Sequence, residues 1–148
     1  MAFATREPSS YLTTIMSDES GQAGTNMLLK EEVYAIQGAV FEVYREMGSG
    51  FLESVYQECL ERELESRGIP YIAQPDIRLS YKGAILQHAC RPDLVCHGKV
   101  ILEIKAVREI APEHRAQVLN YLRATGHRLG LIVNFGHHPK VEIERFVR

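Results

Sequence analysis

Residues 91–106 constrain the fold of this chain most, because they hold two short apolar runs that carry charges and are separated by a turn at Gly98. Side chains alternate between the two faces of a β-strand, so Glu103 and Lys105 point the same way while their apolar neighbours point into packing. Burying two charged side chains among apolar ones costs free energy unless they are paired or bind a ligand. We therefore expect a hairpin with a functional face.

The register of this hairpin decides whether two carboxylates meet. If the hairpin is centred on Gly98, Asp93 lies directly across from Glu103 and their side chains share one face of the sheet. Opposed carboxylates repel unless one holds a proton or a cation neutralises them, and Mg²⁺ needs only one or two protein carboxylates beside waters and phosphate oxygens. A two-residue turn at 97–98 or 98–99 would instead place the carboxylates on opposite faces.

The rest of the sequence predicts one α/β domain over residues 27–148, preceded by a polar, flexible tail over residues 1–26. Apolar residues at helical spacing predict helices over 29–47, 52–67 and 112–125. Alternating or fully apolar runs predict strands near 71–81, 84–90, 93–97, 99–107, 129–135 and 141–147. We expect a meander with a Lys82-Gly83 turn, a central strand over 99–107, and then a βαβ crossover that favours a parallel pair in a mixed sheet.

Composition excludes several classes of protein. The 148 residues carry a formal net charge of −2, so any contact with nucleic acid must come from a local patch rather than from overall attraction. The three cysteines lie within apolar patterns and indicate reduced intracellular thiols rather than a disulfide framework. No apolar run approaches the roughly 18 residues of a membrane span, and the N-terminus lacks the order of a secretory signal. We expect a cytoplasmic protein.

Four ordered segments resemble those of one nuclease superfamily. Asp93, then Glu103-Ile104-Lys105, then Gln117 on the following helix match the PD-(D/E)XK pattern, and the segment 50–56, reading Gly-Phe-Leu-Glu-Ser-Val-Tyr, resembles the signature of its GxxExxY branch. The resemblance extends from about Leu29 to Arg148. It implies a restriction-endonuclease-like core, with a central mixed β-sheet flanked by α-helices, and metal-dependent hydrolysis of phosphodiester bonds in DNA or RNA.

The resemblance also implies a role for each matched residue. The acidic residues at the positions of Asp93 and Glu103 bind Mg²⁺ or Mn²⁺ together with the backbone carbonyl of Ile104, and the lysine at the position of Lys105 assists the attacking water. An acidic residue on an early helix often completes the metal site, and Glu53 stands where that residue is expected. We expect these residues to form the catalytic and metal-binding set.

Three further residues are expected near the substrate. Gln117 and Tyr121, four apart and so on one helix face, resemble the Gln-x-x-x-Tyr element of RecB-like exonucleases. They would orient Lys105 or contact the nucleic-acid backbone, and Gln117 would thereby join the catalytic set. Tyr56 is a third candidate for contact with substrate, although its apolar neighbours favour a core or gateway aromatic.

Each assignment has an alternative. If Asp93 only starts a strand, Glu103 and Lys105 would form an exposed cross-sheet ion pair. Glu53 lies in the first turn of its helix, where the helix dipole favours a carboxylate even without a catalytic role. A zinc site at His88, Cys90, Cys96 and His97 lacks the usual Cys-x-x-Cys pairs, so buried thiols explain these residues better. The alternative for the whole domain is a nuclease-fold module that cleaves weakly or not at all and that binds nucleic acid or a partner protein. The amphipathic first helix and the edge strand are also compatible with a homodimer.

Overall fold

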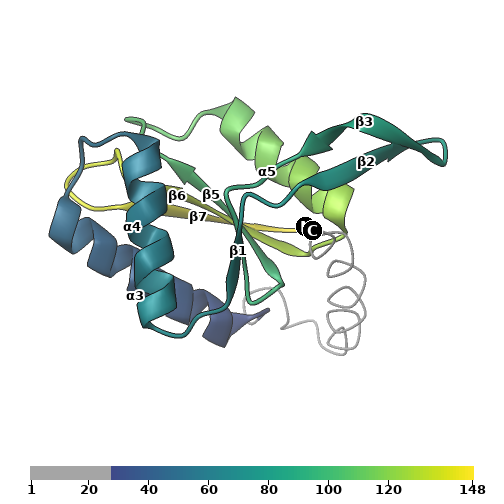
Figure 1. The fold of residues 1–148 in the computed structure, drawn as a ribbon. Coiled ribbons are helices and arrows are strands. Elements are labelled where there is room, and N and C mark those ends of the chain that lie inside the picture. The colour runs from purple at the N-terminus through teal and green to yellow at the C-terminus, as the bar shows by residue number, and fades with distance from the viewer. Residues whose placement is uncertain (1–27) are drawn as a thin grey trace.

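A five-stranded mixed β-sheet carries helices on both faces in the computed structural model, which describes residues 28–148 (Figure 1). The predicted tail, residues 1–26, lies outside the described residues. In spatial order the strands are β1 (Tyr71–Ala73), β4 (Leu94–Cys96), β5 (Val100–Lys105), β6 (Leu129–Asn134) and β7 (Glu142–Val147). The predicted fold class, a central mixed sheet flanked by helices, is confirmed.

The three helices bury opposite faces of the sheet. Alternate residues of β5 point to α3 (Lys30–Met47) and α4 (Glu53–Ser66), where Leu102 and Ile104 join the main apolar core. The residues between them point to α5 (Pro112–Thr125), where Ile101 packs against Leu122. β5 and β6 run parallel on either side of α5 in the chain, and β6 is buried along its whole length. The predicted central strand and βαβ unit are therefore confirmed.

The helices end where the sequence supplies stop signals. Gly48 follows α3 with φ +68° and Gly126 follows α5 with φ +79°, the left-handed region that glycine tolerates best. Pro112 occupies the first turn of α5, where its missing N–H costs nothing. The bounds of all three helices agree with the prediction to within one residue.

The hairpin between β4 and β5 has the register centred on Gly98. Leu94 lies opposite Leu102 and Cys96 opposite Val100, so three residues form the turn. Gly98 adopts φ +63° there. Continuing the register by one step brings residue 93 opposite residue 103. The predicted centring is confirmed, and the two-residue turns are wrong.

One part of the predicted meander is wrong. The run near 71–81 divides at Gln74, whose φ is +47°, and at Pro75, which has no N–H to continue a strand ladder. Only β1 joins the main sheet, whereas β2 (Ile77–Tyr81) and β3 (Ala84–Cys90) form a two-stranded sheet of their own around the predicted Lys82-Gly83 turn. Among residues 28–148, none of the helices has the length and apolar character needed to span a bilayer.

Gly136 generates a prediction about the fold. The chain leaving β6 passes so close to the segment after β5 that a β-carbon at this position would overlap the backbone nitrogen of Val107. We expect Gly136→Ala to lower the free energy of unfolding by about 2 kcal/mol, because backbone cannot yield as a side chain does. Urea denaturation measures this. The control Ser80→Ala, on the exposed hairpin, should change it by less than about 0.5 kcal/mol, and an equally small change for Gly136→Ala would contradict the close approach.

Candidate metal centre

Four hydrogen bonds fix Asp93 immediately before β4. Its backbone N–H donates to Oε1 of Glu103 at 3.0 Å, and its own Oδ2 accepts the backbone N–H of Ile104 at 2.7 Å. Its carbonyl oxygen accepts the backbone N–H of Gln74 at 2.9 Å and the side-chain amide of Gln57 at 3.2 Å. Each of the two carboxylates therefore spends one oxygen on a backbone N–H and keeps its other oxygen for further contacts.

Both carboxylates of this pair resist ionisation. Burial, followed by the charge of Asp93, raises the pKa of Glu103 to about 8, and only 3% of Glu103 is exposed. Burial also raises the pKa of Asp93, and the nearby charge of Glu53 acts in the same direction. Burial and the neighbouring carboxylates thus outweigh the charge of Lys105, which acts to lower both pKa values, as expected for opposed carboxylates.

Lys105 lies beside this pair on the α5 face of the sheet. Its Nζ is 3.8 Å from Oε2 of Glu103, and the two side chains are 14% and 4% exposed. The predicted alternative, an exposed cross-sheet ion pair, is therefore wrong. Lys105 Nζ also donates to Oε1 of Gln117 at 3.3 Å, and Gln117 donates in turn to the hydroxyl of Tyr121 at 3.0 Å. A single row of hydrogen bonds thus connects the lysine to α5.

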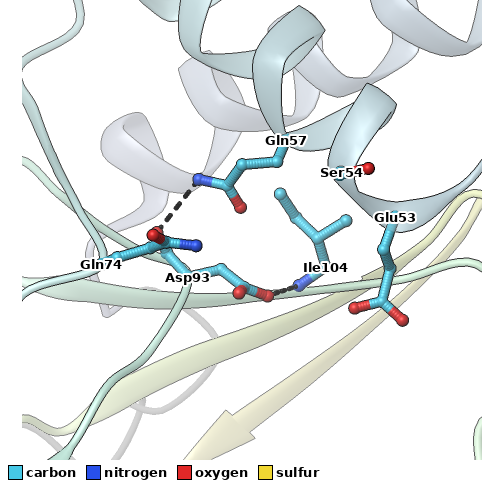
Figure 2. Close-up of a pocket in the computed structure, with 6 residues that line it drawn as sticks. All are labelled: Glu53, Ser54, Gln57, Gln74, Asp93 and Ile104. Atoms are coloured by element: carbon cyan, nitrogen blue, oxygen red, sulfur yellow. Dashed lines mark hydrogen bonds between the residues drawn. The ribbon is translucent and has the colours of Figure 1, made fainter.

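A pocket of about 220 Å³ opens on the other side of β5, toward α4 (Figure 2). Ile104 forms part of its wall, and because the N–H and C=O of one residue in a strand point to the same edge, the Ile104 carbonyl faces Asp93 as its N–H does. Figure 2 shows the Glu53 side chain extending from the start of α4 along the wall of this pocket. The complete lining is Glu53, Ser54, Gln57, Gln74, Asp93 and Ile104.

The loop between α3 and α4 brings Glu53 to this wall. The hydroxyl of Tyr56 donates to the carbonyl of Gly48 at 2.5 Å and accepts the backbone N–H of Phe51 at 3.2 Å. Gly50 adopts φ +115°, which a residue with a side chain rarely adopts. These two features close the loop and make Glu53 the first residue of α4.

The expected contact of Tyr56 with substrate needs correction. The residue is fully buried, and its ring stacks on Phe135 at a centroid distance of 4.5 Å. Both roles of its hydroxyl are taken by backbone groups. Tyr56 is therefore a core aromatic that holds the loop beside Glu53, as the alternative interpretation predicted.

The donor set suits a hard cation. Among residues 28–148, no group of three or more His, Cys, Asp and Glu side chains is close enough together to hold a metal ion. The site offers instead two adjacent carboxylates, the carbonyl of Ile104, and Glu53 on the pocket wall. Oxygen donors of this kind match Mg²⁺ or Mn²⁺, which keep several waters. Cys96 is a free, buried thiol whose pKa burial raises to about 12, in agreement with the interpretation that favoured buried thiols over a zinc site.

Three residues of the site escaped the sequence analysis. Gln57 follows Glu53 by four positions on α4, so helical spacing alone would have placed both on one face. Asn134 lies opposite Lys105 in the parallel register and is buried, with its Oδ1 accepting the backbone N–H of Val107. A lone polar residue ending an apolar strand was the available signal for it. Gln74 gave no such signal, because only its backbone conformation brings it to the pocket.

Comparisons with known proteins identify the superfamily and the fold. A family model described as the PD-(D/E)XK nuclease superfamily matches residues 30–146. A solved structure titled "Crystal structure of SSO0001" is similar with a TM-score of 0.52 at 16% sequence identity, over 65% of this chain and 50% of that chain. This chain therefore spans half the length of that protein, and such a likeness shows the fold alone. The comparison with curated proteins gave no match.

The raised pKa of Glu103 predicts how stability depends on pH without metal. Between the ordinary glutamate pKa and about 8, the folded state keeps a proton that the unfolded state loses, so the free energy of unfolding falls as pH rises. Glu103→Gln carries no such proton. We expect it to gain roughly 2–4 kcal/mol relative to the parent between pH 5 and pH 8.5.

Urea denaturation in EDTA at the two pH values measures this difference. The control Glu58→Gln, at an exposed position of α4, should keep the same difference from the parent at both pH values. A pH-independent difference for Glu103→Gln would show that this carboxylate ionises normally in the folded protein.

Proposed function

Since the chain belongs to the PD-(D/E)XK nuclease superfamily, we propose that it is a Mg²⁺- or Mn²⁺-dependent nuclease that hydrolyses phosphodiester bonds of nucleic acid. The observation that carries this proposal is the pair of hydrogen bonds between Asp93 and β5. They hold two carboxylates side by side at the start of β4, next to Lys105. This is the arrangement in which oxygen ligands and a cationic side chain serve metal-assisted hydrolysis.

Each residue of the centre has a distinct task in the proposed reaction. Asp93, Glu103 and the carbonyl of Ile104 would hold the ion, with Glu53 nearby on the pocket wall. The bound ion would supply Lewis-acid charge and a water of lowered pKa. The ammonium of Lys105 would orient the attacking water and face the negative charge that develops on the phosphate oxygens.

Gln117 acts through Lys105 in this proposal. Its carbonyl oxygen accepts from the Lys105 ammonium, while its amide donates to Tyr121. Burial, followed by the charge of Glu103, raises the pKa of Tyr121 to about 12, so its hydroxyl stays protonated. Gln117 is thus a positioning residue, and Tyr121 holds Gln117 while its partly buried ring packs against Val95, Ile101 and Leu122.

We further propose that the chain belongs to the GxxExxY branch of the superfamily. The structural role of each signature residue supports this placement. Gly50 permits the turn before α4, Glu53 lines the pocket, and Tyr56 closes the loop through its hydroxyl. The signature therefore encodes the delivery of one acidic side chain to the centre.

Removal of the central charges tests the proposed reaction. We expect Glu103→Ala and Lys105→Ala to reduce metal-dependent cleavage by on the order of 10²–10⁴-fold while the circular dichroism spectrum is retained. Gel assays on single- and double-stranded DNA and RNA with Mg²⁺ or Mn²⁺ measure the loss. The controls Glu32→Ala and Lys99→Ala remove an ion pair at the opposite end of β5 and should keep parental cleavage.

Unchanged cleavage in both site variants would disprove the proposed centre. Binding of nucleic acid by the parent without any turnover would favour the alternative of a nuclease-fold module that binds but does not cleave.

Gln117 gives a separate prediction. Gln117→Met keeps the length of the side chain but removes the acceptor for Lys105, so we expect kcat to fall by about 10- to 100-fold with KM unchanged. Gln117→Glu restores an acceptor oxygen and should recover most of the rate. A rise in KM alone would assign Gln117 to substrate contact, and equal losses in both variants would assign it to structure.

A further inference from the structure

The hairpin of β2 and β3 leaves the body of the protein beside the candidate metal centre. The two strands pair only with each other and project past α5 (Figure 1). The residues where the hairpin begins and ends, Gln74 and Asp93, both line the pocket and are joined by a backbone hydrogen bond of 2.9 Å. Arg91 donates to Asp76 at 2.6 Å across the base. The base is therefore fixed beside the carboxylates.

The outer part of the hairpin is exposed and partly apolar. Ile77 is buried at the base, whereas all residues of β3 before Cys90 are exposed. Tyr81 and Ile85 near the tip are 63% and 76% exposed, and Lys82 Nζ lies 5.4 Å from the centre of the Tyr81 ring. Two-stranded ribbons gain little stability by themselves, so apolar side chains on one indicate a contact surface rather than a core.

The charge of the hairpin is opposite to that of the whole chain. Residues 76–91 hold three basic side chains, Arg78, Lys82 and Arg91, against the single acidic Asp76, which gives a formal charge of +2. The complete chain has a formal charge of −2. A local positive ribbon on an acidic protein is complementary to a polyanion that reaches the neighbouring pocket.

We propose that the β2–β3 hairpin binds the strand of nucleic acid that flanks the scissile phosphate. This inference rests on the nuclease function proposed above. Tyr81 stacks on an unpaired base and Lys82 contacts a phosphate, because an aromatic ring beside a cation is the combination that holds single strands without reading their sequence. Stacking requires a base that is not paired, so the hairpin favours single-stranded or frayed substrate.

The test variant removes both tip groups while keeping the turn. Lys82 and Gly83 are the two loop residues, with φ values of +49° and +80°, and Asn tolerates the first conformation well. Thr suits a strand end, so the variant is Tyr81→Thr with Lys82→Asn. The matched control, Lys30→Gln with Tyr34→Gln, removes one lysine and one exposed tyrosine from α3 near the opposite end of β5.

Binding is measured by fluorescence anisotropy on a labelled single-stranded oligonucleotide with Ca²⁺ in place of Mg²⁺, at several salt concentrations. We expect the tip variant to bind about tenfold more weakly than the parent and to lose about one unit of the salt-dependence slope. Cleavage of a dinucleotide, which is too short to reach the tip, should be unchanged. KM for the long strand should rise, and the control variant should match the parent throughout.

Other outcomes would overturn the proposal in distinguishable ways. If the parent cleaves and the tip variant matches the control, the hairpin does not bind substrate although the nuclease function stands. If the parent neither binds nor cleaves any nucleic acid, the proposed function fails and the hairpin's role fails with it. If sedimentation shows a dimer of the parent that the tip variant abolishes, with unchanged binding, the hairpin is an interface between two copies.

Discussion

The candidate site depends on two reciprocal hydrogen bonds between Asp93 and β5. They use side-chain oxygens to continue the sheet one residue beyond the last backbone pair of β4 and β5. β4 begins at Leu94, and one step earlier the carboxylate of Asp93 accepts the N–H of Ile104 while Glu103 accepts the N–H of Asp93. A buried N–H left without an acceptor costs on the order of 1–3 kcal/mol. The carboxylates therefore serve the structure of the sheet, and this fixes their positions before any ligand arrives.

The same arrangement carries an electrostatic cost that the rest of the fold offsets. Burial, aided by neighbouring carboxylates, raises the pKa of the buried Glu103 and of the half-buried Asp93, so the site is least stable where both are ionised. The surrounding strands are nearly all apolar, and β6 is buried along its length. A rigid apolar frame thus holds the two carboxyl groups in place, which is the condition under which a cation binds with little rearrangement.

Local patterns predicted most of the fold and part of the site. The three helices and the central strand follow from periodicity and from turn chemistry within short windows, whereas the sequence left the register about Gly98 open between two kinds of turn. The separate hairpin was missed because one residue in a left-handed conformation before Pro75 decides it. The burial of Tyr56 depends on Phe135, far along the chain, and Asn134 acts through a loop that no local pattern reveals. Tertiary contacts of this kind lie outside what spacing can encode.

The topology also separates the proposed metal-binding carboxylates from the β2–β3 hairpin that we propose binds nucleic acid. The hairpin is inserted between two neighbouring strands, β1 and β4, and its base is fixed by the bond between Gln74 and Asp93. Substitutions at its tip therefore leave the register of β4 and β5 undisturbed, because no tip residue contributes a hydrogen bond to the main sheet. Exposed segments on a rigid frame tolerate change more readily than core strands do. Substrate preference can thus diverge at the tip while the carboxylates keep their geometry.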